Sequence, residues 1–138
     1  MKAKLFTVLA GVLTALFTMS ALAGELKDKK DITFKINKEV VEANLLQGVE
    51  SENFGLRTSS ALMLGDIQSS KAVFPLMRML KYEDDERARI AAALSLYKIG
   101  DPVGIYAVKQ QARFDSSERV RKLCGLFYQE YKNENKEG

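Results

Sequence analysis

Three arginines, Arg57, Arg89 and Arg121, recur 32 residues apart along this 138-residue chain. A row of guanidinium groups suits anions, because arginine forms paired hydrogen bonds with carboxylates and phosphates. Acidic residues lie near the turns that precede these arginines, and they are Glu52, Asp84, Asp85, Glu86, Asp115 and Glu118. One role open to this arginine ladder is therefore an anion site.

Most other catalytic chemistry is excluded by composition. The chain contains no histidine and a single cysteine, Cys124, so it holds no Ser-His-Asp or Cys-His nucleophile system. It also lacks a glycine-rich phosphate loop, a paired-cysteine motif and a cluster with metal-ligand spacing. Glu83, Asp84 and Asp85 could serve acid–base work, but without a pocket signature we interpret them as solvated helix caps. We predict no catalytic site, no cofactor and no metal, and hence no enzyme.

Cys124 lies on an apolar face beside Leu123 and Phe127. We interpret it as buried and inert, with a reactive thiol or an intermolecular disulfide as the alternative. A single cysteine cannot form an internal disulfide, so the stability of the domain must come from packing.

The first residues have the pattern of a targeting segment. Two lysines precede an uncharged, mostly apolar run that ends in Ala21-Leu22-Ala23, which is typical of a secretory signal peptide over residues 1–23. An uncleaved membrane anchor is the alternative, because the run approaches the roughly 20 residues that span a bilayer. Cleavage would leave a periplasmic or secreted protein with no stable membrane insertion.

The excess of basic residues comes largely from this first segment. Without Lys2 and Lys4 the chain has 19 basic and 18 acidic residues, so its net charge falls from +3 to +1. That balance gives no reason to propose nucleic acid as a partner. Residues 24–36 are charged and irregular, and we interpret them as a linker. A short extended piece is the alternative, because Ile32, Phe34 and Ile36 alternate with polar residues.

Residues 37–131 predict six helices and no convincing strand. Apolar residues recur at i, i+3, i+4 and i+7, as in Val73, Leu76, Met77 and Leu80. Capping residues and glycines predict where the helices begin and end. Asn37 caps a first helix that begins at Lys38 and stops at Gly48, and a second helix starts at Ser51. After a break at 68–70, with Ser70 as cap, we predict helices over 71–82, 86–99 and 102–114 and a last helix that ends at Tyr131. Residues 132–138 are predicted to be a polar tail.

The helices repeat in pairs with the period of the arginine ladder. Small residues recur at Ala61, Ala93 and Gly125, where we expect neighbouring helices to approach closely. The segments LRTSSALMLGDIQSSKAVFPL and ARIAAALSLYKIGDPVGIYAV resemble HEAT repeats, and most closely the short HEAT-like repeats first described in phycobilisome lyases. The first segment departs from the family pattern at Ser69-Ser70, where Asp-Pro is usual.

The resemblance implies an all-α, right-handed solenoid of antiparallel helix pairs, with about three repeats. In that family the repeated arginine ties one repeat to the next through turn carboxylates and carbonyls. We therefore expect a structural role for the arginine ladder in preference to an anion site.

The second helix of each pair lines the concave side in solenoids of this kind. On these helices Phe74, Arg78, Tyr106, Gln110 and Arg113 fall off the buried stripe, and we predict that they contact a protein partner. Lys81, Tyr82 and Phe114 also fall off the stripe, although Tyr82 and Phe114 could instead pack against the adjoining turn.

These observations predict an exported, non-catalytic protein-binding module that acts as an adaptor, scaffold or assembly helper. One alternative is a chromophore lyase-like or lyase-accessory protein, and another is a structural envelope component. So short an array has exposed apolar ends, through which weak self-association is possible.

Overall fold

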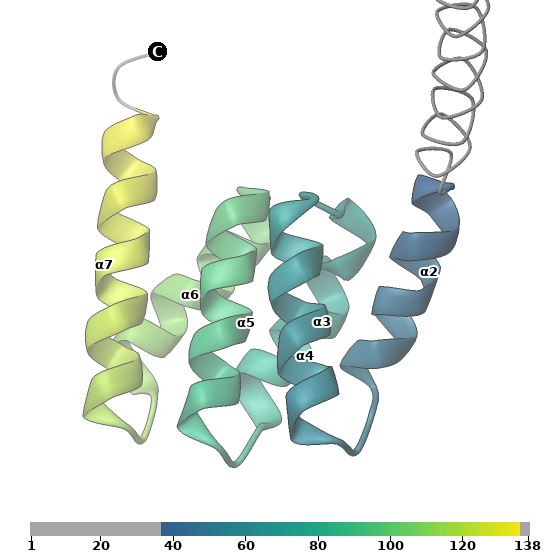
Figure 1. Cartoon of the computed structure of the whole chain (residues 1–138). Helices are drawn as coiled ribbons and strands as arrows, with labels where there is room; N and C mark the ends of the chain where they lie inside the picture. Colours follow the sequence, from purple (N-terminus) through teal and green to yellow (C-terminus); the bar gives the residue numbers. More distant parts are fainter. Residues whose placement is uncertain (1–36, 136–138) are drawn as a thin grey trace, which may run out of the picture. The chain divides into compact units, whose positions relative to one another are not determined.

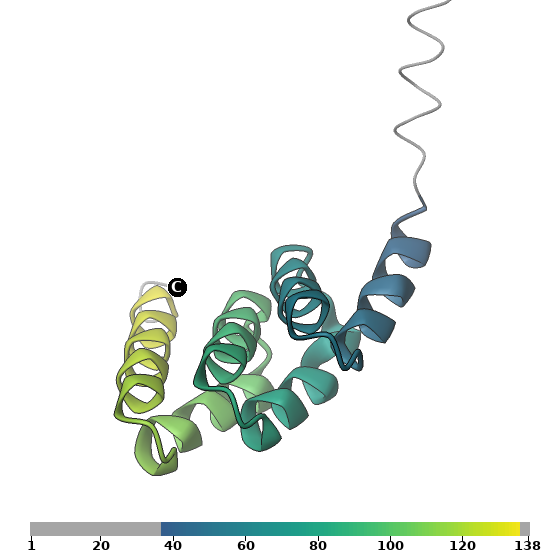
Figure 2. The same ribbon diagram turned by 60° about the horizontal axis from the view of Figure 1, so that its bottom comes forward.

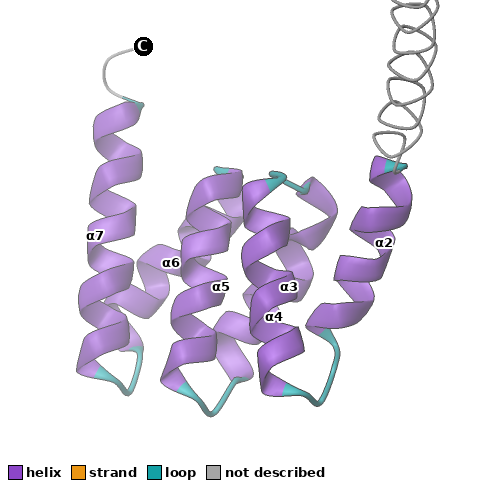
Figure 3. Cartoon of the chain, viewed as in Figure 1, coloured by secondary structure: helices purple, strands orange, loops and turns teal. Residues whose placement is uncertain are grey.

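The computed structural model describes residues 37–135, and within this range every regular element is a helix (Figures 1 and 3). The elements are α2 (Lys38–Val49), α3 (Phe54–Asp66), the short 3-10 helix η1 (Ser70–Ala72), α4 (Val73–Tyr82), α5 (Glu86–Ile99), α6 (Pro102–Phe114) and α7 (Glu118–Glu134). The predicted all-α class is thus confirmed for the described residues. The predicted signal peptide and linker lie outside them.

Side-chain caps start the later helices as the sequence predicts. Asp85 accepts a hydrogen bond from the Arg87 backbone N–H at 2.8 Å, and Asp101 accepts one from the Val103 N–H at 2.8 Å. Pro102 occupies the first turn of α6, where its missing N–H has no intrahelical partner to lose. These caps fix where α5 and α6 begin, and with them the register between the helices.

The predicted start of α3 at Ser51 is wrong, because α3 begins at Phe54. Asn53 is the cap, and its side-chain oxygen accepts from the Leu56 N–H at 3.0 Å. Ser51 instead accepts from the Asn53 N–H at 3.1 Å. Two capping residues stood close together in the sequence, and the one nearer the apolar run starts the helix.

The break before α4 also differs from prediction. Ser70 is the first residue of η1, and the α-helix begins at Val73 rather than Lys71. Neither η1 nor α4 has a side-chain cap, which matches the absence of the Asp-Pro pair that starts α6.

Gly48 was predicted to end the first helix in a left-handed conformation, and this is wrong. Gly48 lies inside α2, and a Cβ at this position would overlap the Ser60 side chain. Left-handed backbone occurs instead at Gly100, with φ of 72°, and at Gln68, with φ of 52°. These two residues are one repeat apart, so the same turn follows α3 and α5, although glycine favours that turn and glutamine does not.

The helices are arranged in two rows (Figures 1 and 2). In one row α3 packs against α5, and α5 packs against α7; in the other, α4 contacts both α2 and α6. Across the rows, α2 packs on α3, α4 on α5, and α6 on α7. The side chains buried between the rows form one core, which includes Leu64, Leu76, Leu80, Leu96, Val108, Val120 and Cys124.

Close approach of the helices in the first row depends on small residues. Ala61 and Ala93 are fully buried, and a Cβ at Gly65 would lie 2.7 Å from the Ser95 Cα. At Gly125 the predicted close approach is wrong, because a Cβ there would have nothing within 4 Å. No described helix lies beyond α7 in its row, so nothing packs on this position.

Helix α7 continues to Glu134, three residues into the segment predicted as a polar tail. The Tyr97 hydroxyl donates a hydrogen bond to Glu134 at 2.8 Å, and the Tyr97 ring stacks on Phe127 with centroids 5.8 Å apart. Contacts with α5 therefore hold the last turns of α7, which no apolar pattern in residues 132–134 would predict.

Two alanine substitutions test this packing. Gly65→Ala should destabilise the domain by about 1–3 kcal/mol, because its Cβ would press on the Ser95 backbone. Gly125→Ala should stabilise it by roughly 0.5–1 kcal/mol, since alanine is the better helix former and has open space there. Circular dichroism melts of the two variants and the parent measure both effects. Similar shifts of the same sign would contradict the close approach of α3 to α5.

Candidate functional site

The arginine ladder binds the turns between helices, and Arg89 shows the arrangement most fully. Its Nε and Nη2 groups donate to the two carboxylate oxygens of Asp115 at 3.0 and 2.9 Å. Its Nη1 donates to the carbonyl oxygens of Glu83 and Asp84 at 2.8 and 2.9 Å. Arg89 is buried, with 7% of its surface exposed. One guanidinium therefore joins the turn before α5 to the turn before α7.

Arg57 makes the same contacts one repeat earlier. Its Nη1 donates to the carbonyl oxygens of Ser51 and Glu52 at 2.7 and 3.1 Å. Its Nη2 donates to Glu83 at 3.0 Å, and its Nε lies 2.5 Å from the other oxygen of that carboxylate. Glu83 is not among the carboxylates that were predicted to lie beside the ladder. The sequence nevertheless contains the pattern that predicts this contact, because Glu83 lies one 32-residue repeat before Asp115.

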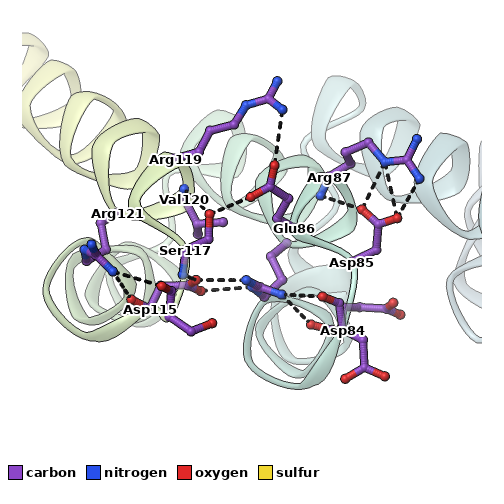
Figure 4. Close-up of polar contacts among 12 residues, drawn as sticks. Asp84, Asp85, Glu86, Arg87, Asp115, Ser117, Arg119, Val120 and Arg121 are labelled. Atoms are coloured by element: carbon purple, nitrogen blue, oxygen red, sulfur yellow. Dashed lines mark hydrogen bonds and ion pairs between the residues drawn. The ribbon is translucent and has the colours of Figure 1, made fainter.

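Arg121 keeps only half of the pattern. Its Nη1 donates to the carbonyl oxygens of Asp115 and Ser116 at 2.6 and 3.2 Å (Figure 4). Among residues 37–135 it has no carboxylate partner of the kind that Arg57 and Arg89 have.

The chemistry of the ladder favours a structural role over an anion site. In Arg89 the N–H donors are largely occupied by turn carbonyls and a carboxylate, which leaves few donors for an external anion. In Arg57 the buried Nε makes no hydrogen bond, but it lies against the Glu83 carboxylate, which would repel a second anion. The hydrogen bonds that Arg89 donates to Asp115 raise the pKa of Arg89 above its ordinary value, so the guanidinium stays charged across the usual pH range.

Two acidic residues of the same turns, Asp85 and Glu86, also have hydrogen-bond partners (Figure 4). The side chain and backbone of Arg87 donate to Asp85 and lower the pKa of that carboxyl to about 2. The Ser117 hydroxyl donates to Glu86 at 2.6 Å, and this bond lowers the pKa of Glu86. A carboxyl held ionised in this way is a poor general acid. Among the described residues no group of three or more His, Cys, Asp or Glu is placed to hold a metal ion.

The predicted partner-contact residues lie together on the outward side of α4 and α6. Phe74 is 72% exposed and Tyr106 is 59% exposed, and they are one repeat apart. Arg78 and Arg113 are exposed, and Gln110 is half-buried. We call this surface the α4/α6 face, which consists of Phe74, Arg78, Lys81 and Tyr82 on α4 and Tyr106, Gln110, Arg113 and Phe114 on α6.

The α4/α6 face has two matching ridges. Phe74, Arg78 and Tyr82 are four residues apart on α4, so they follow one side of the helix. Residues 106, 110 and 114 repeat this spacing on α6. Tyr82 and Phe114 are 69% and 75% exposed, so packing against the adjoining turn leaves most of each ring in solvent.

Two equivalent clefts open beside these ridges. One, of about 340 Å³, lies between Tyr82, Arg78 and the turn at Glu50–Glu52. The other, of about 400 Å³, lies between Phe114, Lys81 and the turn at Glu83–Asp84. Both clefts are shallow and carry charges of both signs, which suits contact with a protein surface better than enclosure of a small substrate.

Within residues 37–135 no helix is both long and apolar enough to cross a bilayer. The comparisons with known proteins agree with the fold. The family model for HEAT repeats matches residues 42–125, which is more than half of the chain. A search among curated proteins found no match to the chain.

Removing a ladder arginine should cost stability in proportion to its burial. Arg89→Ala should lower the free energy of unfolding by about 3 kcal/mol, because it leaves the buried Asp115 carboxylate unpaired. Arg78→Ala should cost less than about 1 kcal/mol, since its ion pair with Glu50 is exposed. Urea unfolding followed by circular dichroism compares the two. Equal urea midpoints for the two variants would contradict a structural role for Arg89.

Cys124 should be unreactive in the folded protein. It is fully buried, and burial raises the pKa of its thiol to about 12, so almost no thiolate, the reactive form, is present near neutral pH. An aromatic disulfide reagent added at pH 8 should label the denatured chain quickly and the native chain only as fast as it unfolds. Rapid, stoichiometric labelling of the native protein would contradict this burial.

Proposed function

Because the chain belongs to the HEAT-repeat family, we propose that it is an exported, non-catalytic module that binds another protein. HEAT repeats commonly mediate protein–protein interaction. In this role the chain serves as an adaptor, scaffold or assembly helper, and the α4/α6 face is the contact surface. The observation that carries the proposal is the pair of matching ridges with exposed aromatic rings on consecutive repeats.

Two large exposed rings at the same position of consecutive repeats form a candidate contact surface. Folding gains little from Phe74 and Tyr106, because most of each ring stays in water. Aromatic and arginine side chains are the types that contribute most to binding at protein interfaces. A repeat domain holds them in fixed positions, so a partner does not have to order them on binding.

The finer geometry belongs to the same proposal. We propose antiparallel helix pairs stacked as a right-handed solenoid, with the α4/α6 face on the concave side, and repeats of the short type first described in phycobilisome lyases. The two helix rows and the 32-residue register support this arrangement.

Export is proposed from the sequence of residues 1–23, which has the pattern of a cleaved signal peptide. The mature protein would then work in the periplasm or outside the cell, with residues 24–36 as a charged linker. The absence of histidine from the sequence supports a non-catalytic role.

The test is a pair of double variants combined with crosslinking in the native envelope. Phe74→Ala with Tyr106→Ala should reduce partner capture by about thirtyfold or more, as expected when central interface rings are removed. The matched control is Leu56→Ala with Leu126→Ala, which removes two exposed side chains, 53% and 57% accessible, from α3 and α7. Both variants should melt close to the parent.

Quantitative mass spectrometry of the crosslinked proteins provides the measurement. A set of neighbours that both double variants leave unchanged would contradict the proposal and favour a structural envelope component without a specific partner.

A further inference from the structure

The two helices that form the α4/α6 face contain no acidic residue. Helix α4 has the sequence VFPLMRMLKY and α6 the sequence PVGIYAVKQQARF. Between them they carry Arg78, Lys81, Lys109 and Arg113, in a chain whose total charge is nearly balanced at 21 basic and 18 acidic residues. Positive charge is therefore concentrated on these two helices.

The cations on this face are only partly neutralised. Arg78 pairs with Glu50, and both side chains remain more than half exposed. Lys81 lies over the Tyr82 ring, 5.1 Å from its centroid, which places a cation beside an exposed aromatic ring. Arg113 is exposed and makes no hydrogen bond or ion pair with the rest of residues 37–135.

Exposed acidic groups border the face at the turns that precede α3 and α5. Glu50 and Glu52 line the cleft beside Tyr82, and Asp84 lines the cleft beside Phe114. All three are exposed. The surface thus has a basic and aromatic centre with acidic residues at the turns that precede α3 and α5.

From this distribution of charge, and resting on the function proposed above, we propose that the α4/α6 face binds an acidic peptide segment of its partner. Carboxylates of that segment lie against Arg78, Lys81 and Arg113, and its apolar side chains lie against Phe74 and Tyr106. Uncharged or basic residues of the segment lie beside Glu50, Glu52 and Asp84, where a carboxylate would be repelled.

The acidic border favours a peptide over other anionic partners. A bilayer of anionic lipid or a nucleic acid presents negative charge along its whole length, and either would bring some of it against the exposed turn carboxylates. A peptide can alternate acidic and other residues, so it can match both parts of the surface.

The experiment is selection from a phage-displayed library of random peptides on the purified protein. Enriched peptides should carry net negative charge together with aromatic or aliphatic residues. Synthetic versions should bind at least tenfold more weakly to Arg78→Glu with Arg113→Glu, because like charges then face each other. Their affinity should also fall as salt is raised.

A matched charge control separates this effect from net charge alone. Lys38→Glu with Lys122→Glu changes the protein's charge by the same amount at exposed positions on α2 and α7, and it should leave the affinity within about twofold, as expected for distant exposed charges screened by salt. Circular dichroism of both double variants confirms that they are folded.

The outcomes distinguish this inference from the proposed function. Enriched peptides that need Phe74 and Tyr106 but are neutral or basic would overturn the acidic segment and leave the binding face in place. A library without any enriched peptide, or with peptides indifferent to Phe74 and Tyr106, would overturn both. Sedimentation with vesicles of phosphatidylcholine and phosphatidylglycerol that is lost in Arg78→Glu with Arg113→Glu would assign the face to a membrane surface, and this too would overturn the inference.

Discussion

The bond between an arginine and two successive turns is the constraint on which the rest of the structure depends. Arg89 joins the carbonyl groups of the turn before α5 to the Asp115 carboxylate in the turn before α7. A guanidinium in this position must face inward, so its position in α5 fixes the rotation of that helix. The same rotation buries Leu96 and Ala93 between the rows and leaves the ridges of α4 and α6 outward. Fold and candidate site thus share one register.

This register could be predicted from the sequence because several types of residue indicate it independently. The arginines and the small residues Ala61 and Ala93 follow the period of 32 residues, and Gly100 to Pro102 carries the stop, cap and start signals between α5 and α6. Local competition was harder to predict. Ser51 and Asn53 are both good caps, and only the packing of α3 decides between them. Glycine often ends a helix, yet Gly48 lies inside α2. Glycine is needed there because Ser60 occupies the space that a side chain would fill.

The last described repeat has a more polar outward side than the repeat before it. Positions that are apolar in the middle repeat become polar one period later: Ile90 is followed by Lys122, and Tyr97 is followed by Gln129, and both later residues are exposed. Terminal repeats of solenoids need such polar outer faces for solubility. Among the described residues no helix packs beyond α7, so Gly125 and Arg121 lack the neighbours that their equivalents have.

Residues on the α4/α6 face are free of these folding constraints, and this freedom is the main reason to assign them a function. Phe74 and Tyr106 do not hold the ladder, cap a helix or fill the core, and polar side chains at both positions would satisfy the same fold. Large aromatic side chains at the same outward position of consecutive repeats, on helices without a single acidic residue, contribute little to stability in water. Their cost in exposed apolar surface is offset only when another molecule covers them.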